Sequence, residues 1–220
     1  GLVEPQSSGI GGGGFMLVYE RAESTMTFHD GREVAPQAVS ADIFMENGEV
    51  MPFIRAWQSG KAVGVPGAVA LYEQAHKQHG KLNWPTLFEP AINLARRGFI
   101  VSPRLASLLE LLRPVSRLDD NPGAKEYFYP NGSALQAGFT RTNPEYAETL
   151  QRLANEGADA FYTGSIAKSI VAAVRANPDP GTITKSDLAR YSALTRPVVC
   201  GSFAAYRICG ATPPSSGALQ

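Results

Sequence analysis

Arg32 and Glu33 are two adjacent charged side chains at a position from which they could bind a small molecule. They lie in the segment 31–36 (GREVAP), directly after a stretch with strand character that ends at Asp30. A planar guanidinium can donate two parallel hydrogen bonds to one carboxylate, and a strand end is a rigid platform for such a group. The residues alone leave two interpretations open: Arg32 binds a carboxylate, or it pairs at the surface with Asp30 or Glu33.

The serines and histidines offer weaker candidates for chemistry. Ser215 and Ser216 have no Ser-x-x-Lys pattern and no identifiable base near them, so we expect helix-capping serines and not nucleophiles. The three histidines lack metal-ligand spacing and form no recognisable triad, so the sequence predicts no metal site and no cofactor. His76 and His79 are expected to be solvated near a helix end, and His29 to lie in the core or at the rim of a strand.

The two cysteines, Cys200 and Cys209, flank a predicted hairpin. If Ala204 and Ala205 form its turn, the two cysteines face each other across the strands, and a disulfide becomes conceivable. Two buried thiols are the alternative that the sequence favours.

Composition excludes several classes of protein. Twenty basic and twenty acidic residues cancel, and no basic patch points to nucleic acid as a partner. No apolar stretch is long enough to predict a membrane span. The chain of 220 residues begins at Gly1 without an initiator Met and stops at Gln220, where the sequence pattern indicates the beginning of a further helix or strand. We therefore expect it to be part of a longer protein.

Hydrophobic periodicity and turn signals predict strands near both ends of the chain and a helical middle. The expected strands are residues 14–21, 24–30, 197–200 and 205–209, and the expected helices are about 67–79, 85–97, 103–112, 144–155 and 166–176, with a short one from 184. Residues 119–135 are polar and rich in turn signals, which predicts a surface excursion. The pattern indicates an α+β fold in a single incomplete domain, 1–220, whose strands share a sheet covered by the helices.

Glycines at positions 9 and 11–14 nearly match the G-x-G-x-x-G pattern of dinucleotide-binding loops. That pattern requires a strand before the loop and a helix after it, whereas here a poor strand precedes it and a good strand follows. No helix N-terminus would then meet a phosphate. We expect instead that Gly11–Gly14, and Gly217 near the other end, permit close packing of the backbone.

Six phrases together resemble the gamma-glutamyltranspeptidase family of N-terminal nucleophile hydrolases. In order along the chain they are 11–16 (GGGGFM), 31–36 (GREVAP), 63–67 (VGVPG), 90–99 (PAINLARRGF), 159–164 (DAFYTG) and 213–217 (PPSSG). The resemblance implies part of a four-layer αββα sandwich, formed by the middle of the large subunit of a self-cleaving precursor. The nucleophilic Thr would begin the small subunit, beyond Gln220. This chain would then hold no catalytic residue and would be inactive alone.

The family's chemistry, if carried over, is transfer of the γ-glutamyl group of glutathione-like amides to water or to amino acids. Arg32 would bind the α-carboxylate of that group. Glu33 would play a secondary part, since neighbouring residues of a strand point to opposite sides. The implied partners are the small subunit and a γ-glutamyl substrate, and the implied location is periplasmic or extracellular. Alternatives are a β-lactam acylase-like or poly-γ-glutamate-cleaving relative, or a non-catalytic binding or structural homologue.

Overall fold

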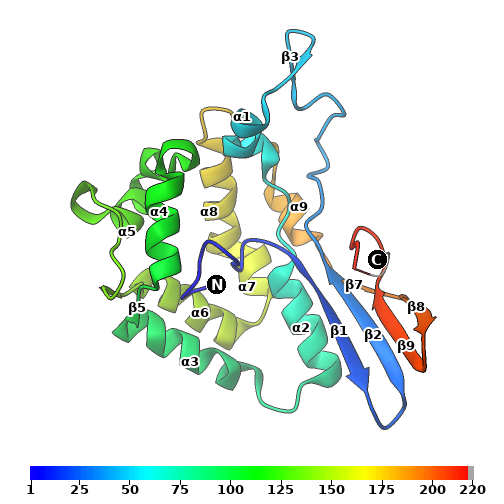
Figure 1. Cartoon of the computed structure of the whole chain (residues 1–220). Coiled ribbons are helices and arrows are strands. Elements are labelled where there is room, and N and C mark those ends of the chain that lie inside the picture. Colours follow the sequence, from blue (N-terminus) through cyan, green and yellow to red (C-terminus); the bar gives the residue numbers. More distant parts are fainter. Residues whose placement is uncertain (218–220) are drawn as a thin grey trace.

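The computed structural model describes residues 1–217 and has an α+β architecture, with a twisted antiparallel sheet beside a helical layer (Figure 1). The sheet has the order β1-β2-β7, formed by β1 (Gly14–Glu20), β2 (Thr25–Gly31) and β7 (Leu194–Arg196). Gly14 pairs with Gly31, and Phe28 pairs with Arg196. The expectation that the predicted strands of both chain ends share one sheet was wrong for residues 197–200 and 205–209, which form a separate two-stranded hairpin. The later part of the chain reaches the sheet instead through β7, a strand that the sequence did not predict.

The helices between these strands agree with the predicted middle of the chain. They are α1 (Phe53–Gln58), α2 (Ala68–His79), α3 (Trp84–Arg97), α4 (Pro103–Ser116), α5 (Pro122–Phe128), α6 (Pro144–Glu156), α7 (Asp159–Tyr162), α8 (Gly164–Arg175) and α9 (Lys185–Ala189). Several begin where a polar side chain accepts a main-chain N–H. Ser102 caps α4, Asn143 caps α6, and Thr184 forms a capping box with Asp187 at α9.

Short two-stranded ladders connect some of these helices. β3 (Met45–Glu46) pairs with β4 (Glu49–Val50), and β5 (Phe99–Ile100) pairs with β6 (Thr140–Arg141). Single turns of 3₁₀ helix lie at Gly60–Ala62, Leu118–Asp120 and Pro130–Gly132.

The main core lies among the helices on one side of the sheet. Buried apolar side chains of α2, α3, α6, α7 and α8 form one cluster, which includes Val69, Ile92, Leu150, Phe161 and Val174. α2 lies along β1 and β2 (Figure 1). Burial of these side chains supplies most of the driving force that holds the helical layer together.

Most of residues 119–135 lie at the surface, as their composition predicts, but the segment also contributes buried side chains to a second core, which the composition did not predict. Tyr129 and Leu135 are fully buried, and they form a second core with Leu105 and Leu109 of α4. The Tyr129 hydroxyl donates a 3.0 Å hydrogen bond to the carbonyl of Leu109. The polar turns of this segment flank apolar side chains that contact α4, and that long-range contact has no local signal.

The hairpin formed by β8 (Val198–Phe203) and β9 (Tyr206–Ala211) carries a disulfide between Cys200 and Cys209. The two cysteines are directly paired across the strands, and residues 204–205 form the turn. Both cysteines are half-buried. The favoured expectation of two buried thiols was therefore wrong, because the hairpin register brings the two side chains together outside the core.

The C-terminal segment ends in a turn within the described residues, where the N–H of Ser215 donates to the carbonyl of Thr212. The Ser215 hydroxyl accepts from the N–H of Gly217, and residues 212–217 contain no helix. The element expected to start after Gly217 lies outside the described residues. Across positions 1–217, no helix is both long and apolar enough for a membrane crossing.

Candidate functional site

The end of β2 is organised around the buried carboxylate of Asp30. One oxygen, Oδ1, accepts the main-chain N–H of Arg32 at 2.9 Å, and the other, Oδ2, lies 2.7 Å from Nη1 of Arg196 on β7. Asp30 is 7% exposed, so both interactions are shielded from water. The carboxylate therefore fixes the backbone at the point where the chain leaves the sheet.

Tyr191 holds the same turn from the opposite side. Its hydroxyl donates to the carbonyl of Arg32 at 2.8 Å, and its ring stacks on that of Tyr162 with a centroid separation of 5.6 Å. Burial, followed by the nearby carboxylates of Asp30 and Glu33, raises the pKa of Tyr191 to about 12. The phenol is thus a protonated donor at neutral pH, which is the state that this hydrogen bond needs.

The Arg32 side chain leaves this fixed backbone and extends toward solvent. Its side chain is 57% exposed, and Nη1 lies 3.3 Å from Oε2 of Glu33. The expectation that Arg32 and Glu33 point to opposite sides was wrong, because β2 ends at Gly31 and strand alternation no longer applies beyond it. The two side chains instead form a charge pair at the surface.

Glu33 is the less exposed partner, at 31%. Its Oε2 atom is buried and accepts no hydrogen bond within residues 1–217, although it contacts Nη1 of Arg32 at 3.3 Å. Because a carboxylate oxygen has more than one acceptor position, this atom retains capacity for a further N–H group. The pair therefore presents a positive and a negative group side by side.

The glycine-rich loop packs against the backbone on either side of Arg32, at Gly31 and Glu33. A Cβ atom added at Gly13 would lie 2.6 Å from the carbonyl oxygen of Gly31 and 2.8 Å from the nitrogen of Glu33. Close packing is therefore confirmed at Gly13, whereas Gly11 has open space, so at Gly11 the expectation was wrong. Among the described residues, the nearest atom to a Cβ at Gly217 would be the Ser215 hydroxyl oxygen at 3.6 Å, and the expectation for Gly217 stays a prediction.

The carbonyl of Gly12 accepts the N–H groups of Gly67 and Ala68 at 2.9 and 3.0 Å, which occupies the N-terminus of α2. The glycine-rich loop thus does meet a helix N-terminus, contrary to the expectation from the sequence, but its own carbonyl leaves that helix end fewer free N–H groups to offer a phosphate.

Sequence phrases that are far apart along the chain meet here. Val34 and Val65 form an isolated antiparallel bridge, which places 63–67 beside 31–36. The Tyr162 hydroxyl donates to the carbonyl of Pro66 at 3.0 Å, which adds 159–164 to the same assembly. A hollow of about 380 Å³ adjoins it, lined by residues that include Val34, Gln37, Arg190 and Tyr191.

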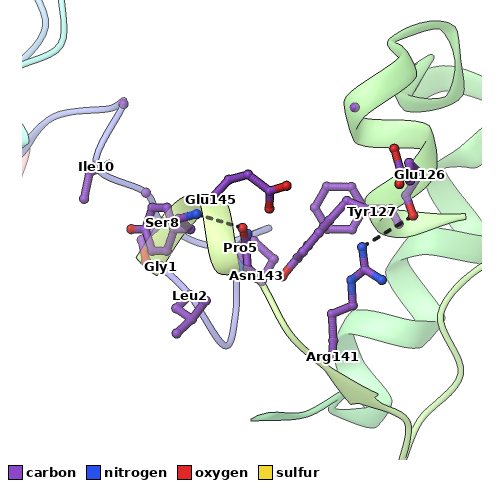
Figure 2. Close-up of a pocket in the computed structure, with 15 residues that line it drawn as sticks. Gly1, Leu2, Pro5, Ser8, Ile10, Glu126, Tyr127, Arg141, Asn143 and Glu145 are labelled. Atoms are coloured by element: carbon purple, nitrogen blue, oxygen red, sulfur yellow. Dashed lines mark hydrogen bonds between the residues drawn. The ribbon is translucent and has the colours of Figure 1, made fainter. Parts of the chain in front are cut away.

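A separate cavity of about 650 Å³ lies between the N-terminal segment and the α5–α6 region. Figure 2 shows Arg141 and Tyr127 on one side of it and Leu2, Pro5 and Ser8 on the other. The Arg141 guanidinium lies 4.3 Å from the centroid of the Tyr127 ring, and it donates to the carbonyl of Glu126. Arg32 and Glu33 do not line this cavity, so it belongs to a different part of the molecule.

The remaining candidates do not join the Arg32 site. His76 contacts the carbonyl of Leu82, whereas His29 and His79 contact each other. His29 is fully buried, as expected of a core residue, but His79 is only 18% exposed and not solvated as predicted. Among residues 1–217, no group of three or more His, Cys, Asp or Glu side chains could hold a metal ion.

Comparison with known proteins identifies the class. The model of the family described as Gamma-glutamyltranspeptidase matches residues 1–220, and the chain belongs to that family. It is 36% identical over 219 residues to Glutathione hydrolase 3 of Arabidopsis thaliana, covering 100% of this chain and 33% of that protein. It is also 36% identical to the Glutathione hydrolase proenzyme of Bacillus subtilis (strain 168), of which it covers 36%. The chain thus spans about a third of the length of these curated relatives.

Solved structures support the same assignment. The gamma-glutamyltranspeptidase of Helicobacter pylori matches with a TM-score of 0.92 at 34% identity, over 99% of this chain and 61% of that one. The α+β class predicted from the sequence is therefore confirmed, in the fold of the N-terminal nucleophile hydrolases. A cephalosporin acylase from Bacillus halodurans matches with a TM-score of 0.77 at 24% identity, a likeness that shows the fold alone.

Proposed function

We propose that the complete protein is a gamma-glutamyl transferase or hydrolase and that this chain binds the amino-acid head group of its substrate. The observation that carries the proposal is the arrangement at the end of β2. Asp30 and Tyr191 hold the backbone of Arg32, while its guanidinium remains exposed beside Glu33. A rigid backbone with an exposed fork of donors is what carboxylate recognition requires.

The charge pair also complements a zwitterion. In the proposal, Arg32 binds the α-carboxylate of the γ-glutamyl group, and Glu33 accepts a hydrogen bond from its α-ammonium. Oε2 of Glu33, which accepts no hydrogen bond within residues 1–217 and has the Arg32 guanidinium as its charged neighbour, supports the second contact. An acyl group that has a carboxylate but no α-ammonium would leave that oxygen without a hydrogen-bond donor, and this favours γ-glutamyl substrates over the acylase alternative.

The bond-breaking step belongs to a part of the protein beyond Gln220. A Thr hydroxyl at the amino terminus of a second subunit attacks the γ-amide carbon, and its own α-amine takes the hydroxyl proton. The amide C–N bond breaks, the amine leaves with a proton, and water or an amino acid then takes the γ-glutamyl group from the ester. Relatives named proenzymes support a precursor of this kind.

We also propose a periplasmic or extracellular location for the complete protein. The Cys200–Cys209 disulfide supports it, because structural disulfides persist mainly in oxidising compartments.

The decisive experiment expresses the complete gene and examines the product by mass spectrometry and by assay. We expect two chains, the second beginning with Thr, and release of amine from γ-glutamyl-p-nitroanilide. The control substrate is glutaryl-p-nitroanilide, which differs only by lacking the α-ammonium group. We expect the protein to hydrolyse it at least tenfold more slowly. An uncleaved product without activity would favour the non-catalytic homologue, and equal rates on both anilides would favour an acylase.

A further inference from the structure

Four polar side chains form an unbroken line between the sheet and α2. Oε1 of Glu20 lies 3.0 Å from Nδ1 of His79, and Nε2 of His79 lies 3.1 Å from Nε2 of His29. Nδ1 of His29 lies 3.1 Å from Oε1 of Gln74, whose amide nitrogen donates to the carbonyl of Ala193 at 3.0 Å. The line crosses from β1 to α2, to β2, and back to α2 (Figure 1).

The middle of this line is shielded from water. His29 is fully buried, and the side chain of His79 is 18% exposed. Only the Glu20 end is open, at 46%. Buried polar atoms must find their partners within the protein, so the donors and acceptors along the line have to match.

The line ends at two acceptors, the Ala193 carbonyl and the Glu20 carboxylate, and each needs a hydrogen-bond donor on the side chain next to it. The Ala193 carbonyl can only accept, so the Gln74 amide nitrogen must face it and the Gln74 oxygen must face His29. His29 therefore donates from Nδ1. A Glu20 carboxylate that carries no proton can also only accept, and His79 then donates from Nδ1 as well.

Two neutral imidazoles cannot satisfy these requirements. A neutral ring carries one N–H, and each ring has placed it on Nδ1, which leaves two Nε2 lone pairs facing each other at 3.1 Å. One additional proton converts this contact into an N–H···N hydrogen bond. We propose that His29 and His79 form a proton-binding site, in which a single proton held between the two Nε2 atoms makes a buried imidazole–imidazolium pair balanced by Glu20.

The geometry of the rings distinguishes a proton from a metal ion. The ring centroids are 5.2 Å apart, which is 2.1 Å more than the 3.1 Å between the nitrogens (5.2 − 3.1). The rings therefore meet nearly end to end, with the lone pairs directed at each other. A proton fits on that line, whereas a metal ion would need the two nitrogens to point at a third position.

Other charged side chains on the surrounding elements are engaged elsewhere. Asp30 on β2 pairs with Arg196 on β7, Glu73 on α2 pairs with Lys77, and His76 contacts the Leu82 carbonyl. Within residues 1–217, Glu20 is thus the charged group that contacts the pair. The site joins α2 to β2 three residues before Arg32, so the bound proton helps to fix the strand that leads to the proposed substrate-binding arginine.

The test uses the full-length protein with ¹⁵N only in its histidine rings. At pH 7, solid-state ¹⁵N spectra of the wild type should show three protonated nitrogens among the four of His29 and His79, with the His79 signals identified by their loss in H79Q and the His29 signals by their loss in H29Q. E20Q is the diagnostic variant, because its amide can donate to Nδ1 of His79. The proton of His79 then moves to Nε2, every group is satisfied without the extra proton, and the count falls to two.

Two results would overturn the proposal. One is a wild-type count of two protonated nitrogens, and the other is an unchanged count of three in E20Q. Neutron diffraction on crystals of the full-length protein gives an independent measurement that requires no variant. It should place one deuteron between the Nε2 atoms and one on each Nδ1, and an empty N–N line would contradict the shared proton.

Discussion

The hydroxyl of Tyr191 donates a 2.8 Å hydrogen bond to the main-chain carbonyl of Arg32, a residue 159 positions earlier in the chain. The two residues come from opposite ends of the sequence, and they meet because β7 pairs with β2. Tyr191 is itself held by stacking on Tyr162. The proposed substrate-binding arginine is thus positioned by a contact that depends on the complete fold of the described chain.

Tyr191→Phe should remove this hydrogen bond while the stacked ring remains. We expect a loss of about 0.5–1.5 kcal/mol in the free energy of unfolding. The KM for a γ-glutamyl substrate should rise severalfold with a smaller change in kcat, because Arg32 loses one of its two backbone supports. Denaturant titration and steady-state kinetics of the full-length protein measure both effects. Tyr19→Phe on β1, where the ring is 57% exposed, is the matched control and should change neither.

Arg32→Lys and Arg32→Ala should weaken substrate binding far more than they affect stability. Loss of a bidentate contact to a carboxylate should raise the free energy of binding by about 2–5 kcal/mol if the pair is desolvated in the complex. The expected signature is a large increase in KM for γ-glutamyl substrates with an unchanged melting temperature, since the side chain is 57% exposed. Arg21→Lys, in the exposed turn after β1, is the control. An unaltered KM in both Arg32 variants would reject the proposed role.

Gly13→Ala and Gly11→Ala form a matched pair within one loop. The Cβ of the first would collide with the backbone of Gly31 and Glu33, whereas the Cβ of the second would meet nothing within 4 Å. We expect Gly13→Ala to destabilise the fold by about 1–3 kcal/mol and Gly11→Ala to be nearly neutral. Thermal unfolding of the two variants measures the difference. Equal melting temperatures would show that the loop adapts and does not pack rigidly behind Glu33.

Protonation of Asp187 at low pH should lower the free energy of unfolding. Hydrogen bonds, from the Thr184 hydroxyl foremost and then from the N–H groups of Gln37 and Thr184, hold the pKa of Asp187 below its ordinary value, and burial opposes them. Because the native pKa is lowered, the ionised form contributes stability above the unfolded value of about 3.9, and that contribution is lost as the pH falls through the native pKa.

Asp187→Asn should therefore cost about 1–3 kcal/mol near pH 7, and the difference from the wild type should shrink when unfolding is measured near pH 3. Urea titrations at the two pH values provide the measurement. Glu23→Gln, at an exposed turn position, is the control and should show no difference at either pH. A constant gap between Asp187→Asn and wild type would mean that the capping box does not depend on the charge.

The Cys200–Cys209 disulfide should be intact in the purified protein and should stabilise the hairpin. A thiol assay under denaturing conditions should find no free thiol from these two residues until a reductant is added. The cysteines are 9 positions apart, and closing so short a loop stabilises by about 2–3 kcal/mol in the chain-entropy model. The double variant C200S/C209S should lose that amount in a denaturant titration, and addition of reductant should lower the stability of the wild type alone.

Local signals in the sequence determined much of the framework. Ser102, Asn143 and Thr184 mark helix starts because each side chain satisfies an N–H a few residues away, and β1 and β2 appear where apolar strand formers flank a short turn. The six ordered phrases identified the family, and the resemblance to that family singled out Arg32, whose chemistry and place after a strand fit the implied role. These features depend on interactions within a few positions along the chain.

Contacts between distant segments decided the rest. No local pattern connects the residues that form these contacts. They are the ion pair of Asp30 with Arg196, the hydrogen bond from Tyr191 to Arg32, the core that contains Tyr129, and the contact of His29 with His79. The family phrase in the sequence pointed to Arg32 and to its neighbour Glu33, whereas the tertiary structure fixed the backbone of Arg32 through Asp30 and Tyr191. The physical reason is that hydrogen-bonding propensity acts over one turn of chain, while burial and pairing depend on which surfaces the whole fold brings together.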